Sequence, residues 1–240
     1  MMRGFFGTTF GRAAGSGALI ALMGLFAMQA GKQGLSDFYV QSARQEIESW
    51  SAPGRQFRGD EWPRVLGYLT EALRYAPNSA WPLEEMGALQ LRRMRAATDP
   101  LLAVAAVRAA NVNFHMALME RPTSPFAWVN LALTKLYLDE IDGEFFEALR
   151  RAEELGPWEP EIQQLVVFVG LAAWQKLDSG QRAAVVRTME RGARKNAGKI
   201  AEIAKGFNRF DLICGISETK LLEGKACSRR QDFKEKSKRQ

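Results

Sequence analysis

Side chains with the chemistry for catalysis are few in this sequence and stand apart from one another. His115 is the single histidine, so no second histidine is present to share a metal ion with it. It has no recognisable catalytic partner beside it, and we expect a packing or surface role. Two pairs of adjacent carboxylates, Glu84–Glu85 and Glu153–Glu154, would point about 100° apart around a helix. That geometry favours solvated side chains over the paired acid and base of a hydrolase.

Sequence motifs that bind nucleotides or build nucleophilic sites are missing as well. The 240 residues contain no G-x-x-x-x-G-K-[ST], no G-x-G-x-x-G and no G-x-S-x-G. We therefore predict no catalytic residue, no cofactor and no metal, and a protein that is not an enzyme.

The two cysteines, Cys214 and Cys227, lie close together near the C-terminus. Beyond a membrane, in an oxidising compartment, they could form a disulfide that closes a short loop. The alternative is two free thiols, because the spacing permits the bond without requiring it. The same spacing excludes a C-x-x-C redox motif.

The N-terminal region has the pattern of a membrane anchor. Residues 13–31 contain no charged side chain and are long enough to cross a bilayer as a helix. Arg3 and Arg12 precede this run without any acidic residue. The positive-inside rule therefore places residues 1–12 in the cytoplasm and the rest of the chain across the membrane. A cleaved signal peptide is the alternative, although its best site has the bulky Met28 where a small residue is preferred.

The rest of the chain predicts helices, because apolar residues recur at three- and four-residue spacing. With 47% apolar and 25% charged residues, it is long enough for one sizeable domain. We expect a helix at residues 35–50, with Ser36 as its cap, and another at residues 62–76. Later helices are expected at residues 161–176 and 181–195, with Ser179 capping the second of these, and residues 200–214 are expected to form one or two closing helices.

Proline turns recur between these helices. Pro77, Pro122 and Pro157 each end a helical segment, and Ser124 and Pro125 have the residue types of a cap and a first helical position. The residues that follow the first two turns resemble the first helix of a tetratricopeptide repeat. The turns are 45 and 35 residues apart rather than the regular spacing of about 34 residues.

We attribute the first excess to an insertion around residues 92–101. The predicted fold is all-α: an N-terminal transmembrane helix followed by a tetratricopeptide-like helical-hairpin solenoid at residues 35–215. Residues 216–240 are rich in Lys and Arg and are expected to form a disordered basic tail.

In such a solenoid the first helices of successive repeats line a concave surface. The corresponding positions here predict a mixed aromatic and polar groove, suited to a peptide segment or a partner helix. The candidate groove residues are Trp81, Glu84, Glu85, Ala88, Arg92, Phe126, Val129, Asn130, Leu133 and Tyr137. The alternative is that the insertion or the C-terminal helices cover this face. The tryptophans other than Trp81 are mostly expected in the core.

Three stretches resemble one protein family. They read S-A-R-Q-E-I-E-S-W at residues 42–50, R-P-T-S-P-F-A-W-V-N-L-A-L-T-K at 121–135 and D-G-E-F-F-E-A-L-R-R-A-E-E-L-G-P-W-E-P at 142–160. They resemble the VpsP-type polysaccharide biosynthesis proteins, which are bacterial membrane-anchored tetratricopeptide proteins associated with exopolysaccharide synthesis and export. The resemblance covers most of residues 35–215 and carries over no catalytic residue. It implies an accessory role in the cell envelope.

Together these observations predict a non-enzymatic scaffold or adaptor of exopolysaccharide biosynthesis or export, acting through protein–protein contacts. It would be a single-pass protein of the bacterial inner membrane, anchored through residues 13–31, with a periplasmic helical domain. The net charge of +6 is widely spread, so no nucleic-acid partner is expected, whereas the basic tail could contact an anionic polymer or lipid. The alternative function is direct polysaccharide binding, with Trp81 and Phe126 stacking on sugars.

Overall fold

The computed structural model describes residues 6–50 and 61–213 of the chain. Within these ranges the regular structure is helical and no strand is present, so the all-α fold class is confirmed. The chain forms two compact units, residues 1–85 (unit 1) and residues 86–240 (unit 2). The possible disulfide between Cys214 and Cys227 and the predicted tail lie outside the described residues.

Unit 1 begins with one continuous helix, α1 (Phe6–Ser49). The prediction of a separate helix that starts at Leu35 with Ser36 as its cap was wrong, because no proline interrupts the chain there. Ser36 instead lies inside α1 and is fully buried. The predicted anchor at residues 13–31 falls within α1, and every side chain described between Leu19 and Leu35 is exposed.

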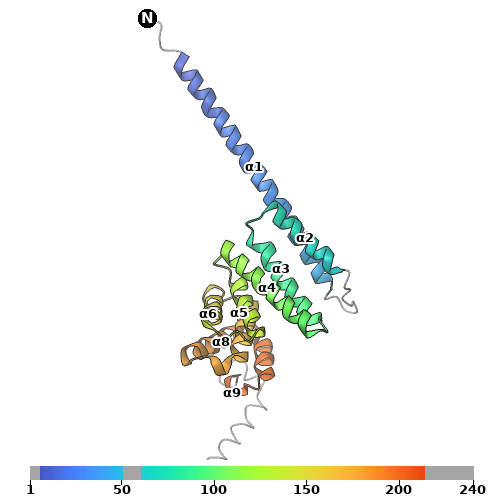
Figure 1. Cartoon of the computed structure of the whole chain (residues 1–240). Helices are drawn as coiled ribbons and strands as arrows, with labels where there is room; N and C mark the ends of the chain where they lie inside the picture. The colour runs from blue at the N-terminus through green and yellow to red at the C-terminus, as the bar shows by residue number, and fades with distance from the viewer. Residues whose placement is uncertain (1–5, 51–60, 214–240) are drawn as a thin grey trace, which may run out of the picture. The chain divides into compact units, whose positions relative to one another are not determined.

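The second half of α1 pairs with α2 (Glu61–Tyr75), and Figure 1 shows the two helices side by side. Each helix buries an apolar stripe with helical spacing. The buried residues are Val40, Ala43 and Ile47 on α1 and Val65, Leu69 and Ala72 on α2. At one edge of this hairpin the Tyr39 ring stacks on the Tyr75 ring, with centroids 5.8 Å apart.

After the Pro77 turn the chain forms α3 (Ala80–Ala96) and then α4 (Pro100–Glu120). The residues interpreted as an insertion are the end of α3, a short turn and the start of α4, so the additional length extends the two helices. Asp99 caps α4 by accepting a hydrogen bond from the Leu101 N–H at 2.8 Å. Gly87 on α3 allows a close approach, since a Cβ there would lie 2.6 Å from the Phe114 ring.

The remaining helices of unit 2 pack as successive neighbours. They are α5 (Pro125–Tyr137), α6 (Gly143–Leu155), α7 (Pro160–Ala172), the 3-10 turn η1 (Trp174–Lys176), α8 (Ser179–Gly206) and α9 (Phe210–Ile213). Helix α5 packs against α4, α6 and α7, and α7 packs against α6 and α8. The predicted start of α5 is confirmed, because Ser124 Oγ accepts a hydrogen bond from the Ala127 N–H and Pro125 opens the helix.

The start of α8 differs from the prediction by one residue. Asp178, not Ser179, is the cap, and it exchanges two hydrogen bonds with Gln181 in a capping box. The helix predicted at residues 181–195 continues to Gly206, with a kink at Asn196 instead of a loop, and the separate helix α9 follows, so residues 200–213 contribute to two helices. Gly170 lets α7 and α8 approach closely, since a Cβ there would lie 2.3 Å from Val185 Cγ2.

One helix of the described residues, α4, is long and apolar enough to cross a membrane. A third of its apolar window is buried in the protein. That buried share includes Ala110, Phe114 and Ala117, none of which has any exposed surface. The face of α4 that carries these residues therefore packs on protein.

Candidate binding cleft

The groove residues predicted in unit 1 are engaged by neighbouring side chains. The Arg44 guanidinium lies 4.6 Å from the centre of the Trp81 ring, and Arg44 Nε donates a hydrogen bond to Glu85 at 2.7 Å. Glu84 is only 4% exposed. The expectation that the Glu84–Glu85 pair is solvated was therefore wrong, because both carboxylates face protein.

The groove residues predicted on α5 are largely buried. Val129, Asn130 and Leu133 are at most 5% exposed, because α5 is covered by α4, α6 and α7. The Phe126 ring packs edge-on against Phe114, with centroids 6.3 Å apart. Tyr137 remains exposed, as does Arg92 on α3, and Ala88 is half-buried. A groove that joins these residues to those of unit 1 remains a prediction.

A different concave surface lies between α6 and α8, with α7 beneath it. This cleft has a volume of about 490 Å³. Its apolar lining includes Leu149, Val166 and Val185 at the floor, together with Phe146 and Ala184. The close approach of α7 and α8 at Gly170 determines where Val185 lies. The polar residues around the cleft are Glu147, Arg150, Glu153, Glu154, Gln181 and Arg187.

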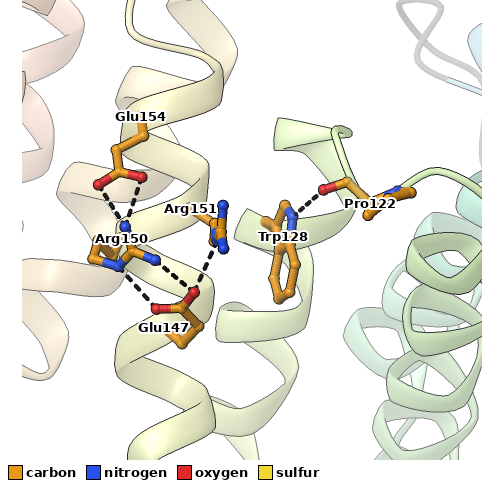
Figure 2. Close-up of polar contacts among 6 residues, drawn as sticks. All are labelled: Pro122, Trp128, Glu147, Arg150, Arg151 and Glu154. Carbon is orange, nitrogen blue, oxygen red and sulfur yellow. Dashed lines mark hydrogen bonds and ion pairs between the residues drawn. The ribbon is translucent and has the colours of Figure 1, made fainter.

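The α6 wall of the cleft carries a network of paired charges (Figure 2). Arg150 bridges Glu147 and Glu154, with its shortest hydrogen bond to each carboxylate at 2.6 Å. Arg151 Nε also donates to Glu147, at 2.8 Å. The hydrogen bonds from Arg150 and then Arg151 lower the pKa of Glu147 to about 2. The pKa of Arg150 is raised by the same hydrogen bonds, first that to Glu147 and then that to Glu154. These charges are thus compensated within the wall.

The α8 wall differs, because it carries a cation without an acidic partner. Arg187 lines the cleft, is exposed and has no ion pair within the described part of the chain. One turn further on, Arg191 is paired with Glu153 of α6 at 2.7 Å. A ligand in this cleft would therefore meet an apolar floor, a neutralised wall and one available guanidinium.

A second charged group lies at the turn between α5 and α6. Lys135, with 6% of its side chain exposed, contacts Glu144 at 2.8 Å, Asp142 at 3.0 Å and Glu140 at 3.8 Å. Burial disfavours the Lys135 ammonium, but the hydrogen bonds to Glu144 and Asp142 outweigh this effect and raise its pKa. The Phe145 N–H, and then Lys135, lower the pKa of Asp142. Because Lys135 is held by three carboxylates and Asp142 also caps α6, the group is structural.

Other residues singled out from the sequence have mostly packing or surface positions. His115 is on the outer part of α4, with Nε2 3.5 Å from Glu144 Oε1. Trp128 is half-buried and donates a hydrogen bond from Nε1 to the Pro122 carbonyl at 2.8 Å (Figure 2). Trp158, expected in the core, is 61% exposed because it lies in the turn before α7. Within residues 6–50 and 61–213 no cluster of His, Cys, Asp and Glu is arranged to hold a metal ion.

The cleft was not found from the sequence, although part of its signal was present. The run Glu147, Arg150, Arg151, Glu154 has the three- and four-residue spacing of ion pairs along one helix face. The sequence contains no local pattern that identifies α8 as the second wall of the cleft. Comparison with known proteins provides no further guide: no family model matches the chain, and no curated protein matches it.

Proposed function

We propose that this protein is a non-enzymatic adaptor that binds a segment of a protein partner in the cleft between α6 and α8. The observation that carries the proposal is the position of Arg187, which has no ion pair among residues 6–50 and 61–213, beside the apolar floor of Leu149, Val166 and Val185. Partner segments that bind helical grooves use apolar anchors, and a charged group fixes their orientation.

The occupant has a definable chemistry. It is a helix or an extended segment with at least one aliphatic or aromatic side chain for the floor and one carboxylate for Arg187. Because Glu147 and Arg150 compensate each other, they would repel neither an acidic nor a basic partner segment strongly. The specificity of binding therefore depends mainly on Arg187 and on the shape of the cleft.

The wider context is also part of the proposal. The packing order from α4 to α9, in which each helix contacts its successor and α5 also contacts α7, supports a tetratricopeptide-like solenoid. The exposed apolar side chains from Leu19 to Met28 support a membrane anchor at residues 13–31. The resemblance to VpsP-type proteins supports a periplasmic role in exopolysaccharide biosynthesis or export. In that setting the partner is a protein of the same machinery.

Direct polysaccharide binding by Trp81 and Phe126 receives no comparable support. The Trp81 ring is covered by Arg44, and Phe126 packs on Phe114. Sugar stacking requires an open aromatic face, and each of these rings is already engaged by a neighbouring side chain.

The proposal is tested by site-specific photo-crosslinking in membranes of the native bacterium. A photoreactive residue replaces Ala184 in the cleft, and in the control it replaces Lys195, which is exposed on α8 and does not line the cleft. We expect a discrete crosslinked protein from position 184 and none from position 195. The Arg187→Glu variant should lose this product, whereas Lys195→Glu, with the same charge change, should keep it.

The amount of exopolysaccharide that the cells make tests whether the contact at Arg187 matters for the proposed biological role. A deletion strain complemented with wild-type protein or Lys195→Glu should make a normal amount of exopolysaccharide, and Arg187→Glu should make less. Normal output and normal assembly of the export proteins in the deletion strain would contradict the adaptor role. A crosslink that survives Arg187→Glu would instead exclude this cleft as the binding surface.

A further inference from the structure

Helix α4 carries most of the exposed large apolar side chains of unit 2 in the described residues. Leu101 is 79% exposed and Leu102 is 52% exposed in the first turn of α4. Val112 and Met119, further along the same helix, are 56% and 75% exposed. Exposed residues at three- and four-residue spacing along this helix form the α4 stripe, which consists of Leu101, Val104, Arg108, Val112, Met116 and Met119. Leu102 lies beside the stripe in the first turn.

The opposite face of α4 is fixed to the protein. Ala110, Phe114 and Ala117 have no exposed surface, and Asn111 Nδ2 donates a hydrogen bond to Thr134 Oγ1 of α5 at 3.0 Å. A helix held in this way cannot be surrounded by lipid as a transmembrane span without losing these contacts. It can, however, present its apolar stripe to a membrane surface and lie in the interface plane.

Positive charge surrounds the exposed apolar residues. Arg92, Arg93 and Arg95 are exposed in the last turns of α3, and Arg108 is exposed within the stripe. Between residues 92 and 119 the single acidic residue is Asp99. Its carboxylate already accepts the Leu101 N–H at the start of α4. Exposed leucines next to clustered arginines are the combination that binds anionic lipid headgroups and inserts shallowly beneath them.

We infer that the α3–α4 hairpin docks on an anionic phospholipid surface, with Leu101 and Leu102 inserted and the arginines among the headgroups. This contact is separate from the predicted anchor at residues 13–31 and from the cleft between α6 and α8. The ligand is the lipid surface itself: the arginines bind its anionic headgroups, and the leucines enter the apolar region beneath them.

A second copy of the chain is a less suitable occupant of the stripe. In a symmetric pair that meets along α4, residues near the middle of the stripe lie close to their own copies. Arg108 is such a residue, so two guanidinium groups would be brought together in an apolar interface. An anionic membrane would instead place a headgroup opposite each of them.

The test measures the depth of single positions with the full chain in nanodiscs. Nitroxide labels are attached at Leu101→Cys or Met119→Cys in a Cys214→Ser/Cys227→Ser background. The control label is at Trp158→Cys, an exposed position of unit 2 outside the hairpin. Discs contain phosphatidylcholine alone or phosphatidylcholine with phosphatidylglycerol. Accessibility to oxygen and to a water-soluble nickel chelate reports whether each label lies in lipid or in water.

In discs with phosphatidylglycerol we expect the labels at 101 and 119 to gain oxygen accessibility and lose nickel accessibility, while the label at 158 stays in water. The double variant Arg95→Glu/Arg108→Glu should abolish that gain. Lys176→Glu/Lys195→Glu, with the same charge change at exposed sites elsewhere, should not. Circular dichroism verifies that each variant is folded.

Three results would overturn the inference. The first is a label at 101 that stays accessible to nickel in both lipid mixtures. The second is equal immersion with and without phosphatidylglycerol, or immersion that survives the arginine substitutions. The third is dipolar broadening in a mixture of chains labelled at 101 and chains labelled at 119, which would identify a second copy as the occupant.

Discussion

The Lys135 ammonium lies 2.8 Å from a carboxylate oxygen of Glu144 at the turn between α5 and α6, although only 6% of the lysine side chain is exposed. Glu144 itself is 45% exposed. The ion pair is therefore asymmetric: the cation has given up most of its water, and the anion has kept much of its own. Removing the lysine and removing the acids should therefore change the stability of unit 2 by different amounts.

Replacing the acids should destabilise unit 2 more than replacing the lysine. Asp142→Asn/Glu144→Gln leaves a buried ammonium with only Glu140 nearby, and we expect a loss of about 2–3 kcal/mol in the free energy of unfolding. Asn retains the capping ability of Asp142, so the cap does not explain the loss. Lys135→Met leaves only exposed carboxylates and should cost about 1 kcal/mol or less. Urea unfolding of the variants measures both values, and the opposite order would contradict this assignment.

Acid should weaken unit 2 through Glu147. Its pKa is lowered from 4.5 to about 2, so the carboxylate contributes stability that is complete above its ordinary pKa. This contribution is lost as the pH falls from about 4.5 toward 2. The effect should be modest, since Glu147 and Arg150 are both more than 40% exposed and solvent screens the pair. Urea unfolding midpoints, measured from about pH 6 down to about pH 3, should fall less steeply in Glu147→Gln than in the wild type.

Gly170 should tolerate no side chain. A Cβ would lie 2.3 Å from Val185 Cγ2, so Gly170→Ala forces α7 and α8 apart and should cost about 1–3 kcal/mol. Gly198→Ala is the matched control on α8, because nothing lies within 4 Å of a Cβ there. It should be neutral or stabilising by about 0.5–1 kcal/mol. Adding Val185→Ala to Gly170→Ala should recover part of the loss, and the absence of any recovery would exclude this contact as the cause.

Arg44 should not be replaceable by lysine. Arg44→Lys loses the planar contact with Trp81 and one of the two hydrogen bonds to Glu85, and we expect a cost of about 1 kcal/mol. Arg74→Lys is the control, since Arg74 is 71% exposed and lies 5.8 Å from the Tyr75 ring. Hydrogen exchange of peptides that cover α2 and the start of α3 should become faster in Arg44→Lys only.

The features that were predicted correctly depend on adjacent residues. Ser124 and Pro125 begin α5 because a cap and a first-turn proline act within a single turn of chain. Helix boundaries that depend on distant packing were predicted less well. Ser36 has the side chain of a cap, yet it lies inside α1, where nothing in the local sequence ends the helix.

The candidate groove shows a second limit. Its residues were assigned from repeat positions, which specify a helix face but not what covers that face. Val129 and Leu133 are buried because α5 has neighbours on several sides. Likewise, a lysine followed by acids gives no sign that Lys135 is buried. The cleft combines α6 with α8, and no local pattern brings those segments together.

The unbroken course of α1 has a mechanical consequence. Residues 32–49 continue the helix that contains the predicted anchor, and they rise about 27 Å along its axis. If residues 13–31 cross the bilayer, no flexible linker separates the span from the α1–α2 hairpin. The helix would then act as a rigid lever, so that any tilt of the span within the bilayer swings the hairpin through the same angle.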